Sequence, residues 1–173
     1  LRAGSTSASP SRSAPPPDPR AVRIAIAADE LTGVAEAIPD ELRRRGHELI
    51  PHGVYAPDTE RPDWAWASEA AARDVAELRA DQAVIACWTG TGASIAANKV
   101  SGVRAALCVD AQTAEGARQW NDANVLALSL RLTSDGALNE ILDAWFDGVR
   151  SDDGADMANV DHLSEIELQR PAT

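Results

Sequence analysis

A thiol followed by small and hydroxylated residues is the clearest chemical feature of the sequence. The run CWTGTGASIAANK at 87–99 contains Cys87, Trp88, Thr89, Gly90, Thr91, Gly92 and Ser94. Glycines let backbone N–H groups approach an oxygen-rich ligand, and a helix N-terminus adds positive potential. The run therefore predicts a cradle for an oxyanion, or, as the alternative, a glycine-containing turn beside a buried structural thiol. It matches neither GxxxxGK[ST] nor GxGxxG, so it gives no support for nucleotide binding.

Acidic residues follow two other apolar runs. Asp29 and Glu30 come after the run at 22–28, and Asp110 comes after the run at 103–109. In an open α/β sheet, right-handed crossovers bring every strand-to-helix loop to the same edge, where ligands bind near the switch in strand order. We therefore expect these carboxylates at the same edge as the loop after Cys87.

The elements that position these residues alternate along the chain. From Val22 onward, short apolar runs alternate with longer amphipathic segments, which is typical of strand and helix units that build a parallel sheet. Strands are predicted at 22–28, 47–50, 82–87, 103–109 and 124–128, and helices at 33–45, 64–79, 94–100, 111–120 and 134–147. The predicted fold class is α/β, a Rossmann-like three-layer sandwich with a five-stranded parallel sheet.

One domain is the expected organisation of 173 residues. Residues 1–20 hold five of the ten prolines and five serines, a composition that predicts a disordered arm. Residues 21–148 form the predicted folded domain. Residues 149–173 form an acidic tail, which we expect to be partly helical.

Charge and composition exclude several classes of protein. The chain has 16 Lys and Arg against 27 Asp and Glu, a formal net charge of −11, which disfavours nucleic-acid binding. No stretch approaches the ~20 consecutive apolar residues of a membrane-spanning helix, and no secretory signal is visible. Cys87 and Cys108 lie in predicted strands, and His47, His52 and His162 lack metal-ligand spacing. We expect a cytoplasmic protein without a metal, in which Cys108 is buried.

The run at 87–99 resembles the loop CGTGxGxSIAANK of the sugar-phosphate isomerases of the ribose-5-phosphate isomerase B and galactose-6-phosphate isomerase type. Four further runs are similar to motifs of this family in the same order: RIAIAADE at 23–30, GVRAAL at 102–107, NDANVLAL at 121–128 and ILDAW at 141–145. The resemblance covers residues 22–147. Several collinear motifs support the fold far more strongly than any one of them.

The resemblance implies an aldose–ketose isomerase that needs no cofactor. In this family a base moves a proton between C1 and C2 of an open-chain sugar while hydrogen-bond donors stabilise the enediolate. Cys87 stands at the position of the base, and nearby N–H groups and a helix end would lower the pKa of its thiol. By the same resemblance, Thr89, Gly90 and Gly92 hold substrate oxygens and Asp29 contacts sugar hydroxyls.

Two departures from the family lie at positions that usually hold histidines able to transfer protons. The residue after Asp29 is usually His and is here Glu30, so an anion replaces a possible cation; with Cys87 and Thr89 it completes the predicted catalytic set. The residue before NDAN is usually a His thought to assist ring opening, and here it is Trp120. An indole cannot shuttle that proton. Trp120 either stacks against a sugar face or only packs.

The remaining predicted substrate-binding residues flank these positions: Tyr55, Trp88, Thr91, Ser94, Asn121 and Arg131. Tyr55 follows a strand at a position that borders the pocket in relatives. Trp64 and Trp66 are two residues apart and cannot share one helix face. One of them is expected to pack, and the other to line the pocket or an interface.

The chain also has fewer candidate anion-binding arginines than the family it resembles. Family members that bind sugar phosphates usually carry arginines after the DAW helix, because Arg matches the charge and geometry of phosphate. Here only Arg150 is basic in the run FDGVRSDDGADMANVDHLSEIE at 146–167, among Asp152, Asp153 and Asp156. Arg131 matches an arginine that contributes to phosphate binding in some members. We therefore expect a substrate that lacks the phosphate, or that carries an amine or another polar group.

Two other functions remain open. One is a divergent relative that performs epimerisation or another proton transfer in a specialised pathway, and the other is a sugar-binding module without catalysis. For partners, the resemblance implies a sugar or sugar phosphate and a homodimer with a shared active site. In such a dimer the NDAN side of one chain faces the Cys87 loop of the other, and the acidic tail packs on the partner subunit.

Overall fold

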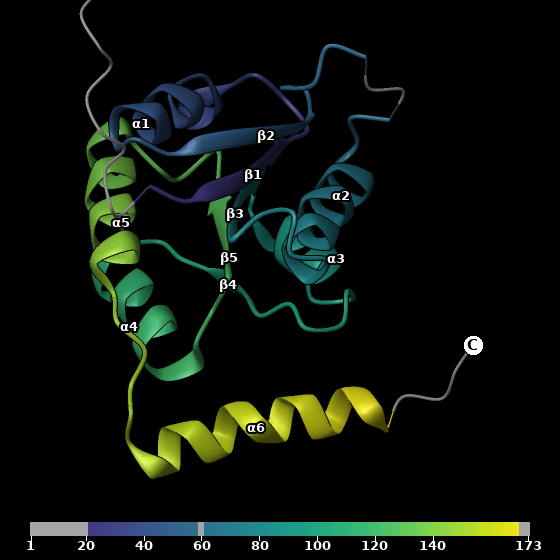
Figure 1. Ribbon diagram of the computed structural model, residues 1–173. Coiled ribbons are helices and arrows are strands. Elements are labelled where there is room, and N and C mark those ends of the chain that lie inside the picture. Colours follow the sequence, from purple (N-terminus) through teal and green to yellow (C-terminus); the bar gives the residue numbers. More distant parts are fainter. Residues whose placement is uncertain (1–20, 59–60, 170–173) are drawn as a thin grey trace, which may run out of the picture.

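The computed structural model describes residues 21–58 and 61–169. These residues build a five-stranded sheet in which all neighbouring strands are parallel, in the order β2-β1-β3-β5-β4 (Figure 1). The strands are β1 (Arg23–Ala28), β2 (Glu48–Gly53), β3 (Gln82–Cys87), β4 (Ala105–Leu107) and β5 (Val125–Ser129). The predicted α/β class with a five-stranded parallel sheet is confirmed.

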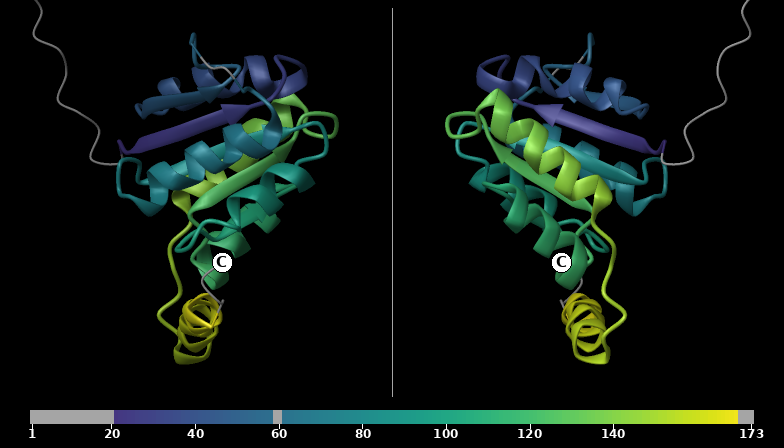
Figure 2. Two further views of the ribbon diagram at one scale, coloured as in Figure 1. Left: turned by 90° about the vertical axis from the view of Figure 1, so that its right-hand side faces the viewer. Right: turned by 90° about the vertical axis from the view of Figure 1, so that its left-hand side faces the viewer.

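Helices cover both faces of the sheet (Figure 2). On one face lie α1 (Ile38–Arg44), α4 (Ala111–Asn121) and α5 (Asp135–Asp147), and on the other lie α2 (Trp64–Ala76) and α3 (Thr91–Ala97). Right-handed crossovers require this division, because the chain reverses its direction across the sheet after β2 and again after β4. The result is the three-layer arrangement that the sequence predicts.

Alternate residues of each central strand belong to different cores. In β1, Ile24 and Ile26 pack with α1, α4 and α5, whereas Ala25 and Ala27 pack with α2 and α3. β3 and β5 are buried over nearly their whole length. Strands buried on both faces are continuous apolar runs in sequence, and this is why they could be recognised.

Three elements in the first half of the chain differ from the prediction, and one of them is α2, which ends at Ala76 instead of residue 79. β2 continues through Pro51 to Gly53 instead of ending at residue 50. At the edge of the sheet a proline costs no ladder hydrogen bond, so it does not end the strand. The helix expected at 33–45 is divided into a 3-10 helix (Gly33–Glu36) and α1, and Pro39 lies in the first turn of α1, where no N–H partner is needed.

Two boundaries in the second half also differ. α3 begins at Thr91, three residues before the predicted start, because Gly90 adopts a positive φ and serves as the N-cap. β4 covers only three residues of the predicted 103–109. It is an edge strand that pairs only with β5 among the described strands, so fewer ladder bonds extend it.

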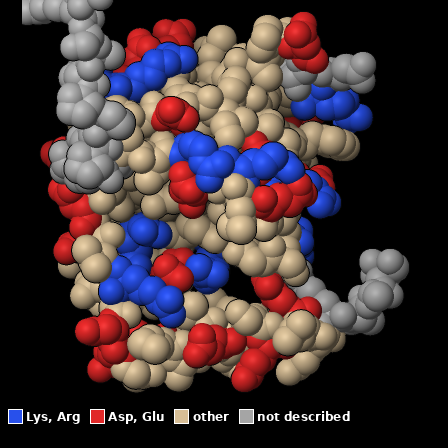
Figure 3. Space-filling view, in the orientation of Figure 1, with Lys and Arg blue, Asp and Glu red and all other residues tan. Residues whose placement is uncertain are grey.

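The acidic tail forms a further helix, α6 (Gly154–Leu168), which runs beside the body near β4 and α4 (Figure 1). Asp153 caps its first turn by accepting the N–H of Ala155 at 2.8 Å. Near its other end, Glu167 accepts the N–H of Gly102 at 2.9 Å. Acidic side chains gather over this helix at the bottom of Figure 3.

A groove of about 560 Å³ separates α6 from the edge of the sheet. Leu163 and Ile166 of α6 border it, and both side chains are nearly half exposed. The predicted arm at 1–20 lies outside the described residues. No helix in the described ranges is long and apolar enough to cross a membrane.

Candidate active site

Three strand ends lie side by side where the chemistry was expected. Ala28 pairs with Ala86, so Asp29 and Cys87 follow neighbouring residues of β1 and β3. Cys87 in turn pairs with Ser129 at the end of β5. The loop after β1 leads to α1 on one face, and the loop after β3 leads to α3 on the other. The strand order switches here, and in open α/β sheets ligands bind in a crevice at such a switch.

The backbone after Cys87 is tied to the end of β5. The carbonyl of Cys87 accepts the N–H of Leu130 at 3.0 Å, and the carbonyl of Trp88 accepts the N–H of Arg131 at 3.1 Å. The Trp88 carbonyl also accepts the hydroxyl of Ser129 at 3.1 Å. Two successive carbonyls thus point toward β5.

This anchoring sets the direction of two amide groups. In a trans peptide the N–H points opposite to the preceding C=O, and no peptide bond in the described ranges is cis. The N–H groups of Trp88 and Thr89 therefore point away from β5, to the side where Asp29 follows β1. Successive amides directed to one side form the kind of concavity that binds anions.

Gly90 makes the turn that ends this loop. Its φ is +75°, and a Cβ atom there would lie 2.5 Å from Leu107 Cδ1 and 2.8 Å from the carbonyl oxygen of Leu128. Only glycine fits. The hydroxyls of Thr89 and Thr91 are 2.7 Å apart across the turn and are exposed. The helix start expected at Ser94 is displaced, since the Ser94 N–H already donates to the carbonyl of Gly90 inside the first turn.

The structure separates the two tryptophans at the start of α2. The indole of Trp64 lies against Gly92, where a Cβ atom would come within 3.0 Å of the ring. The ring of Trp66 instead lies beneath the guanidinium of Arg61, whose Cζ is 3.9 Å from the centroid of the ring. Trp64 therefore borders the Cys87 loop and Trp66 does not. Trp88 is half exposed next to the thiol.

The two thiols differ in their surroundings. Cys87 is 5% exposed at the end of β3, and its side chain belongs to the core under α2 and α3. Cys108 is fully buried in the other core, as predicted, and its Sγ lies 3.7 Å from the carbonyl oxygen of Ala106. Burial, together with the charge of Asp110, raises the pKa of the Cys108 thiol to about 12.

The carboxylate of Asp29 is the least favourably placed charge of the site. Its Oδ1 atom is buried and accepts no hydrogen bond from the described residues. Desolvation raises the pKa of the Asp29 carboxyl above its usual value, and the charges of Glu30 and Asp63 raise it further, against the opposing effect of backbone N–H groups. Glu30 is exposed. The neighbourhood is therefore negative, and a group that donates hydrogen bonds would relieve it.

Tyr55 follows β2 at the same edge of the sheet, and its hydroxyl is engaged within the chain. Its hydroxyl donates to the carbonyl of Ala35 at 2.7 Å, and burial raises the pKa of the phenol. Its ring borders a cavity of about 310 Å³ that is also lined by Pro39 of α1 and Leu49 of β2. Within the chain the 3-10 helix therefore already holds the Tyr55 hydroxyl.

Trp120 and Asn121 lie at the opposite edge of the sheet. α4 starts after the carboxyl end of β4 and runs back, so its last residues precede the amino end of β5. The half-exposed Trp120 indole folds onto its own helix over Gly116, where a Cβ atom would lie 2.7 Å from the ring. One chain therefore does not bring these two residues to Cys87.

The two arginines expected to hold an anion lie in different places. Arg131 follows β5 at the Cys87 edge and is exposed. Arg150 lies 3.8 Å from the carboxylate of Asp122, which also binds Arg104 at 2.9 Å. Asp122 thus offsets the charge of Arg150.

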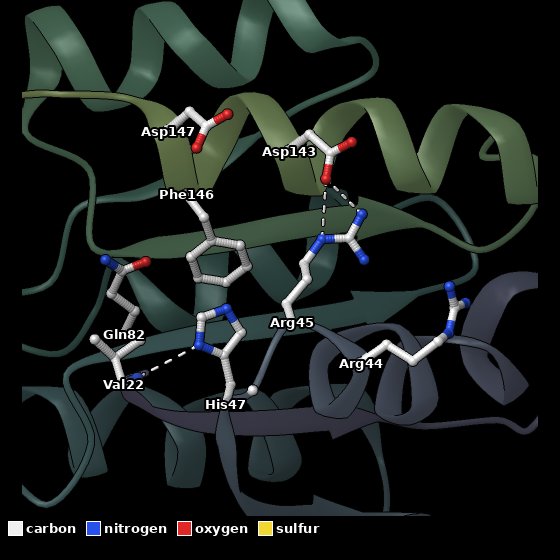
Figure 4. Close-up of a pocket in the computed structure, with 9 residues that line it drawn as sticks. Val22, Arg44, Arg45, His47, Gln82, Asp143, Phe146 and Asp147 are labelled. Carbon is white, nitrogen blue, oxygen red and sulfur yellow. Dashed lines mark hydrogen bonds and ion pairs between the residues drawn. The ribbon is translucent and has the colours of Figure 1, made fainter. Parts of the chain in front are cut away.

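A separate cavity of about 550 Å³ opens at the amino edge (Figure 4). His47 stacks on Phe146 with ring centroids 4.2 Å apart and accepts the N–H of Val22 at 3.4 Å. Arg45 binds Asp143 at 2.6 Å. Because it lies across the sheet from Cys87, this cavity is not part of the crevice. No cluster of three or more potential metal ligands occurs in the described ranges.

Sequence reasoning missed Ser129. The available signal was a hydroxyl at the end of a buried run, in LSLR, two residues before an arginine. That signal is weak, because the partner of Ser129 is 41 positions away in the chain.

Comparison with known proteins identifies the family. Residues 24–163 match the model of the family described as Ribose/Galactose Isomerase. The chain is 38% identical over 125 residues to the galactose-6-phosphate isomerase subunit LacB of Clostridium acetobutylicum, covering 72% of this chain and 71% of that one. It is 34% identical over 149 residues to the ribose-5-phosphate isomerase B of Escherichia coli, covering 86% and 98%. A D-erythrulose-4-phosphate isomerase of Pectobacterium atrosepticum is 34% identical over 125 residues, covering 72% and 82%.

Solved structures agree with this assignment. The type B ribose 5-phosphate isomerase of Trypanosoma cruzi superposes with a TM-score of 0.78 at 32% identity, covering 86% of this chain and 99% of that one. Family match, sequence identity and fold agree, and the matched residues 24–163 include the Cys87 loop. The chain therefore belongs to the ribose/galactose isomerase family and is a sugar isomerase.

Proposed function

We propose that the chain is an aldose–ketose isomerase that uses Cys87 as its base. The observation that carries this proposal is the grouping at the carboxyl edge of the thiol of Cys87, the carboxyl of Asp29 and the outward N–H groups of Trp88 and Thr89. Proton removal next to a carbonyl needs a base on the carbon and donors on the developing oxyanion. This edge offers both.

The reaction runs through an enediolate. The Cys87 thiolate takes the proton from C2 of the aldose, and the C–H electrons shift onto the carbonyl oxygen. The amides of Trp88 and Thr89, with the hydroxyl of Thr89, hold that oxygen. Glu30 carries the hydroxyl proton from O2 to O1, and the thiol returns the carbon-bound proton to C1. Gly90, Thr91, Gly92 and Ser94 shape the cradle, and Asp29 accepts hydrogen bonds from sugar hydroxyls.

The proposed active unit is a homodimer. Trp120 and Asn121 can meet a Cys87 loop only in a second copy, because they lie at the amino edge of their own chain. The half-exposed Leu163 and Ile166 of α6 are apolar surface that a second subunit would bury. Activity should therefore fall on dilution through the dimer dissociation constant. Leu163→Glu should lower the specific activity at a given protein concentration and shift the sedimentation coefficient toward the monomer.

The proposed substrate carries no phosphate. The charges of Glu30 and Asp63 act on the carboxyl of Asp29, and burial together with these charges raises its pKa. Arg150, which follows α5, already faces Asp122. A phosphate dianion would meet repulsion with Arg131 as its main cation, whereas a neutral or amine-bearing group would not.

Deuterium incorporation tests the reaction directly. The full chain is incubated in deuterated water with free and phosphorylated pentoses, hexoses and amino sugars, and NMR follows exchange at C2 and formation of the ketose. Cys87→Ala should abolish exchange, and Cys108→Ala, the matched control in the other core, should retain it. No exchange on any sugar would refute the enzyme assignment.

Epimerisation is the alternative that the exchange experiment separates. An epimerase would return the proton to C2 with inverted configuration, so deuterium would appear without any ketose. The exposed Glu30 supports this alternative, because a second base near C2 could act from the other face of the sugar. By the family resemblance, this position usually holds His. Binding without exchange, equal in the chain and in Cys87→Ala, would instead indicate a sugar-binding module.

A further inference from the structure

Half-exposed tryptophans gather at the Cys87 loop. Of the five tryptophans in the chain, Trp64, Trp88 and Trp120 are 44%, 51% and 52% exposed. Aromatic side chains commonly line the sites where proteins bind small molecules, because their rings offer a large apolar surface and a face that attracts cations. Two of these three indoles adjoin the site proposed above for the sugar.

The two indoles stand at the two ends of one turn. Trp88 follows Cys87 directly, and the ring of Trp64 lies where a Cβ atom on Gly92 would come within 3.0 Å of it. The turn between them is tight, because the N–H of Gly90 donates to the carbonyl of Cys87 at 3.1 Å. Both indoles therefore adjoin the turn that begins at the reacting thiol.

A neighbouring tryptophan shows what such a ring binds in this chain. The guanidinium of Arg61 lies over the ring of Trp66, with its Cζ 3.9 Å from the centroid. A cation in this position is attracted by the negative face of the indole. Among the residues that the structure describes, no cation lies over Trp64 or Trp88. A cation on these two rings must come with the ligand.

Carboxylates adjoin the same indoles. Asp63 directly precedes Trp64, and its charge and that of Glu30 act on Asp29. Of these three carboxylates, Asp63 alone has an ion pair within the described ranges, with Arg61 at 3.0 Å. The Oδ1 atom of Asp29 is buried and accepts no hydrogen bond there. A donor that also carries positive charge satisfies such an oxygen better than a neutral donor does.

The proposed dimer adds a third indole. By the family resemblance, the NDAN side of a second copy faces the Cys87 loop, so that copy's Trp120 faces the site. The same edge carries Arg104 and Arg150, but both bind the carboxylate of Asp122, at 2.9 Å and 3.8 Å. The complete site then combines three indoles with carboxylates, and cages of aromatic rings are a recurring means of binding ammonium groups.

We propose that the substrate is an amino sugar whose ammonium group lies between Trp64 and Trp88 and donates a hydrogen bond to Asp29. The two tryptophans are then specificity-determining residues of the isomerase. The inference rests on the proposed function and narrows its substrate without phosphate to one class. The amine is bound to a carbon beyond C2, because C1 and C2 exchange their protons through Cys87. It takes no part in the proton transfer, so the enediolate reaction is unchanged and needs no co-reactant.

Matched sugars test the charge of the substituent on the unaltered full chain. The panel holds D-ribose, D-glucose, their 3-amino-3-deoxy derivatives, 6-amino-6-deoxy-D-glucose and the N-acetyl form of each amine, which is neutral. Ketose formation and deuterium exchange at C2 are followed by NMR. Since two cation–π contacts and a charged hydrogen bond act together, we expect kcat/KM at least about tenfold higher for an amino sugar than for its N-acetyl form and its parent sugar.

The outcomes separate this inference from the proposed function. Equal kcat/KM for every amino sugar and its N-acetyl form, or a higher value for the parent sugar, overturns the inference and leaves the isomerase intact. D-ribose 5-phosphate preferred over every amino sugar also overturns it, because arginines of the complete dimer would then hold an anion. No ketose and no exchange with any of these sugars overturns the proposed function as well.

Variants separate a cation–π contact from apolar packing. Trp64→Leu and Trp88→Leu keep apolar bulk without an aromatic face, and each should lower the ratio of kcat/KM between the amino sugar and its N-acetyl form at least about threefold. Trp64→Phe and Trp88→Phe should retain most of that ratio. Trp66→Leu is the matched control and should leave the ratio unchanged, because Arg61 already covers its ring.

Two results with these variants count against the inference. An unchanged ratio in both Trp64→Leu and Trp88→Leu overturns it, and so does an equal loss in Trp66→Leu. Circular dichroism confirms that each variant is folded, and the sugar panel on the unaltered chain needs no variant.

Discussion

The hydroxyl of Ser129 donates to the backbone carbonyl of Trp88 at 3.1 Å, and this bond links the end of β5 to the loop that follows Cys87. The Arg131 N–H donates to the same carbonyl. With both lone pairs of the oxygen engaged, the peptide plane is fixed, and the Thr89 N–H is directed away from β5. A hydroxyl outside the reacting groups therefore sets the direction of an amide that the proposed reaction uses.

Ser129→Ala removes one of these two bonds. Because a small displacement of a donor costs much more in the transition state than in substrate binding, we expect kcat to fall about tenfold with KM nearly unchanged. The free energy of unfolding should fall by about 1 kcal/mol, the net value of a buried hydrogen bond. Steady-state kinetics and urea unfolding measure the two effects.

Ser68 supplies the control for that substitution. It is equally buried, and its hydroxyl has no hydrogen-bond partner in the described ranges. Ser68→Ala should leave stability unchanged or raise it, and should leave kcat unchanged. Equal loss of kcat in both variants would show that the Ser129 bond has no special role.

Gly90→Ala should destabilise the fold by about 3 kcal/mol. About 1–2 kcal/mol comes from the positive φ that an alanine must adopt, and the remainder from its Cβ meeting Leu107 and the Leu128 carbonyl. Gly102→Ala is the matched control, since its φ is +80° and its Cβ would meet nothing within 4 Å. Thermal or urea unfolding should show the smaller loss in Gly102→Ala, and equal losses would mean that the loop adjusts without strain.

Two aspartates should affect stability with opposite pH dependence. Burial raises the pKa of Asp29, so its charge destabilises the fold as pH rises from 3.8 through the folded-state value. Asp29→Asn should therefore be more stable than the unaltered chain at pH 7, equal to it below pH 3.8, and much less active. Urea midpoints between pH 3 and 8 measure the difference.

Asp110 is the counterpart. The hydroxyl and the N–H of Thr113 hold the pKa of its carboxyl below the usual value, because both donate to the charged form at the start of α4. The stabilisation is present above pH 3.8 and is lost as pH falls through the folded-state value. Asp110→Ala should lose stability at pH 7 and match the unaltered chain in acid. The same sign for both aspartates would contradict these assignments.

The Cys108 thiol should resist alkylation in the folded chain. With a pKa of about 12, only about 10⁻⁴ of the Cys108 thiol is ionised at pH 8, and the thiolate is the reactive form. Iodoacetamide should therefore leave Cys108 unmodified in the native chain and modify it fully in urea. Mass spectrometry of digested Cys87→Ala protein isolates the Cys108 signal, and labelling of native Cys108 at the rate of a free thiol would exclude this burial.

Much of the fold could be predicted because short patterns of apolar and polar residues indicate its strands and helices. β3 and β5 are continuous apolar runs, since burial on both faces leaves no polar position in them. The edge that holds Asp29 and Cys87 also followed from sequence, because every strand-to-helix loop of a parallel sheet leaves from the same edge. Boundaries were less certain: Pro51 lies inside a strand only because that strand is at the edge of the sheet.

The positions of Tyr55 and Trp120 could not be predicted. Tyr55 follows a strand near the crevice, yet its hydroxyl binds Ala35 on the α1 side. Trp120 belongs to a motif that looks catalytic, yet it lies at the far edge over Gly116. In both cases the direction of the side chain depends on contacts with residues whose proximity the linear pattern does not specify.

The amino-acid sequence alone determined the parallel α/β fold, the family, and the presence of a thiol before a glycine turn, because these depend on residue types at short spacing. Only the tertiary structure decided that Ser129 orients the Trp88 peptide, that Trp64 borders the Cys87 loop, and that Arg61 covers Trp66. The physical reason is the strand order: β5 lies beside β3 although α3, β4 and α4 separate them in the chain, so the contacts that shape the site join residues far apart in sequence.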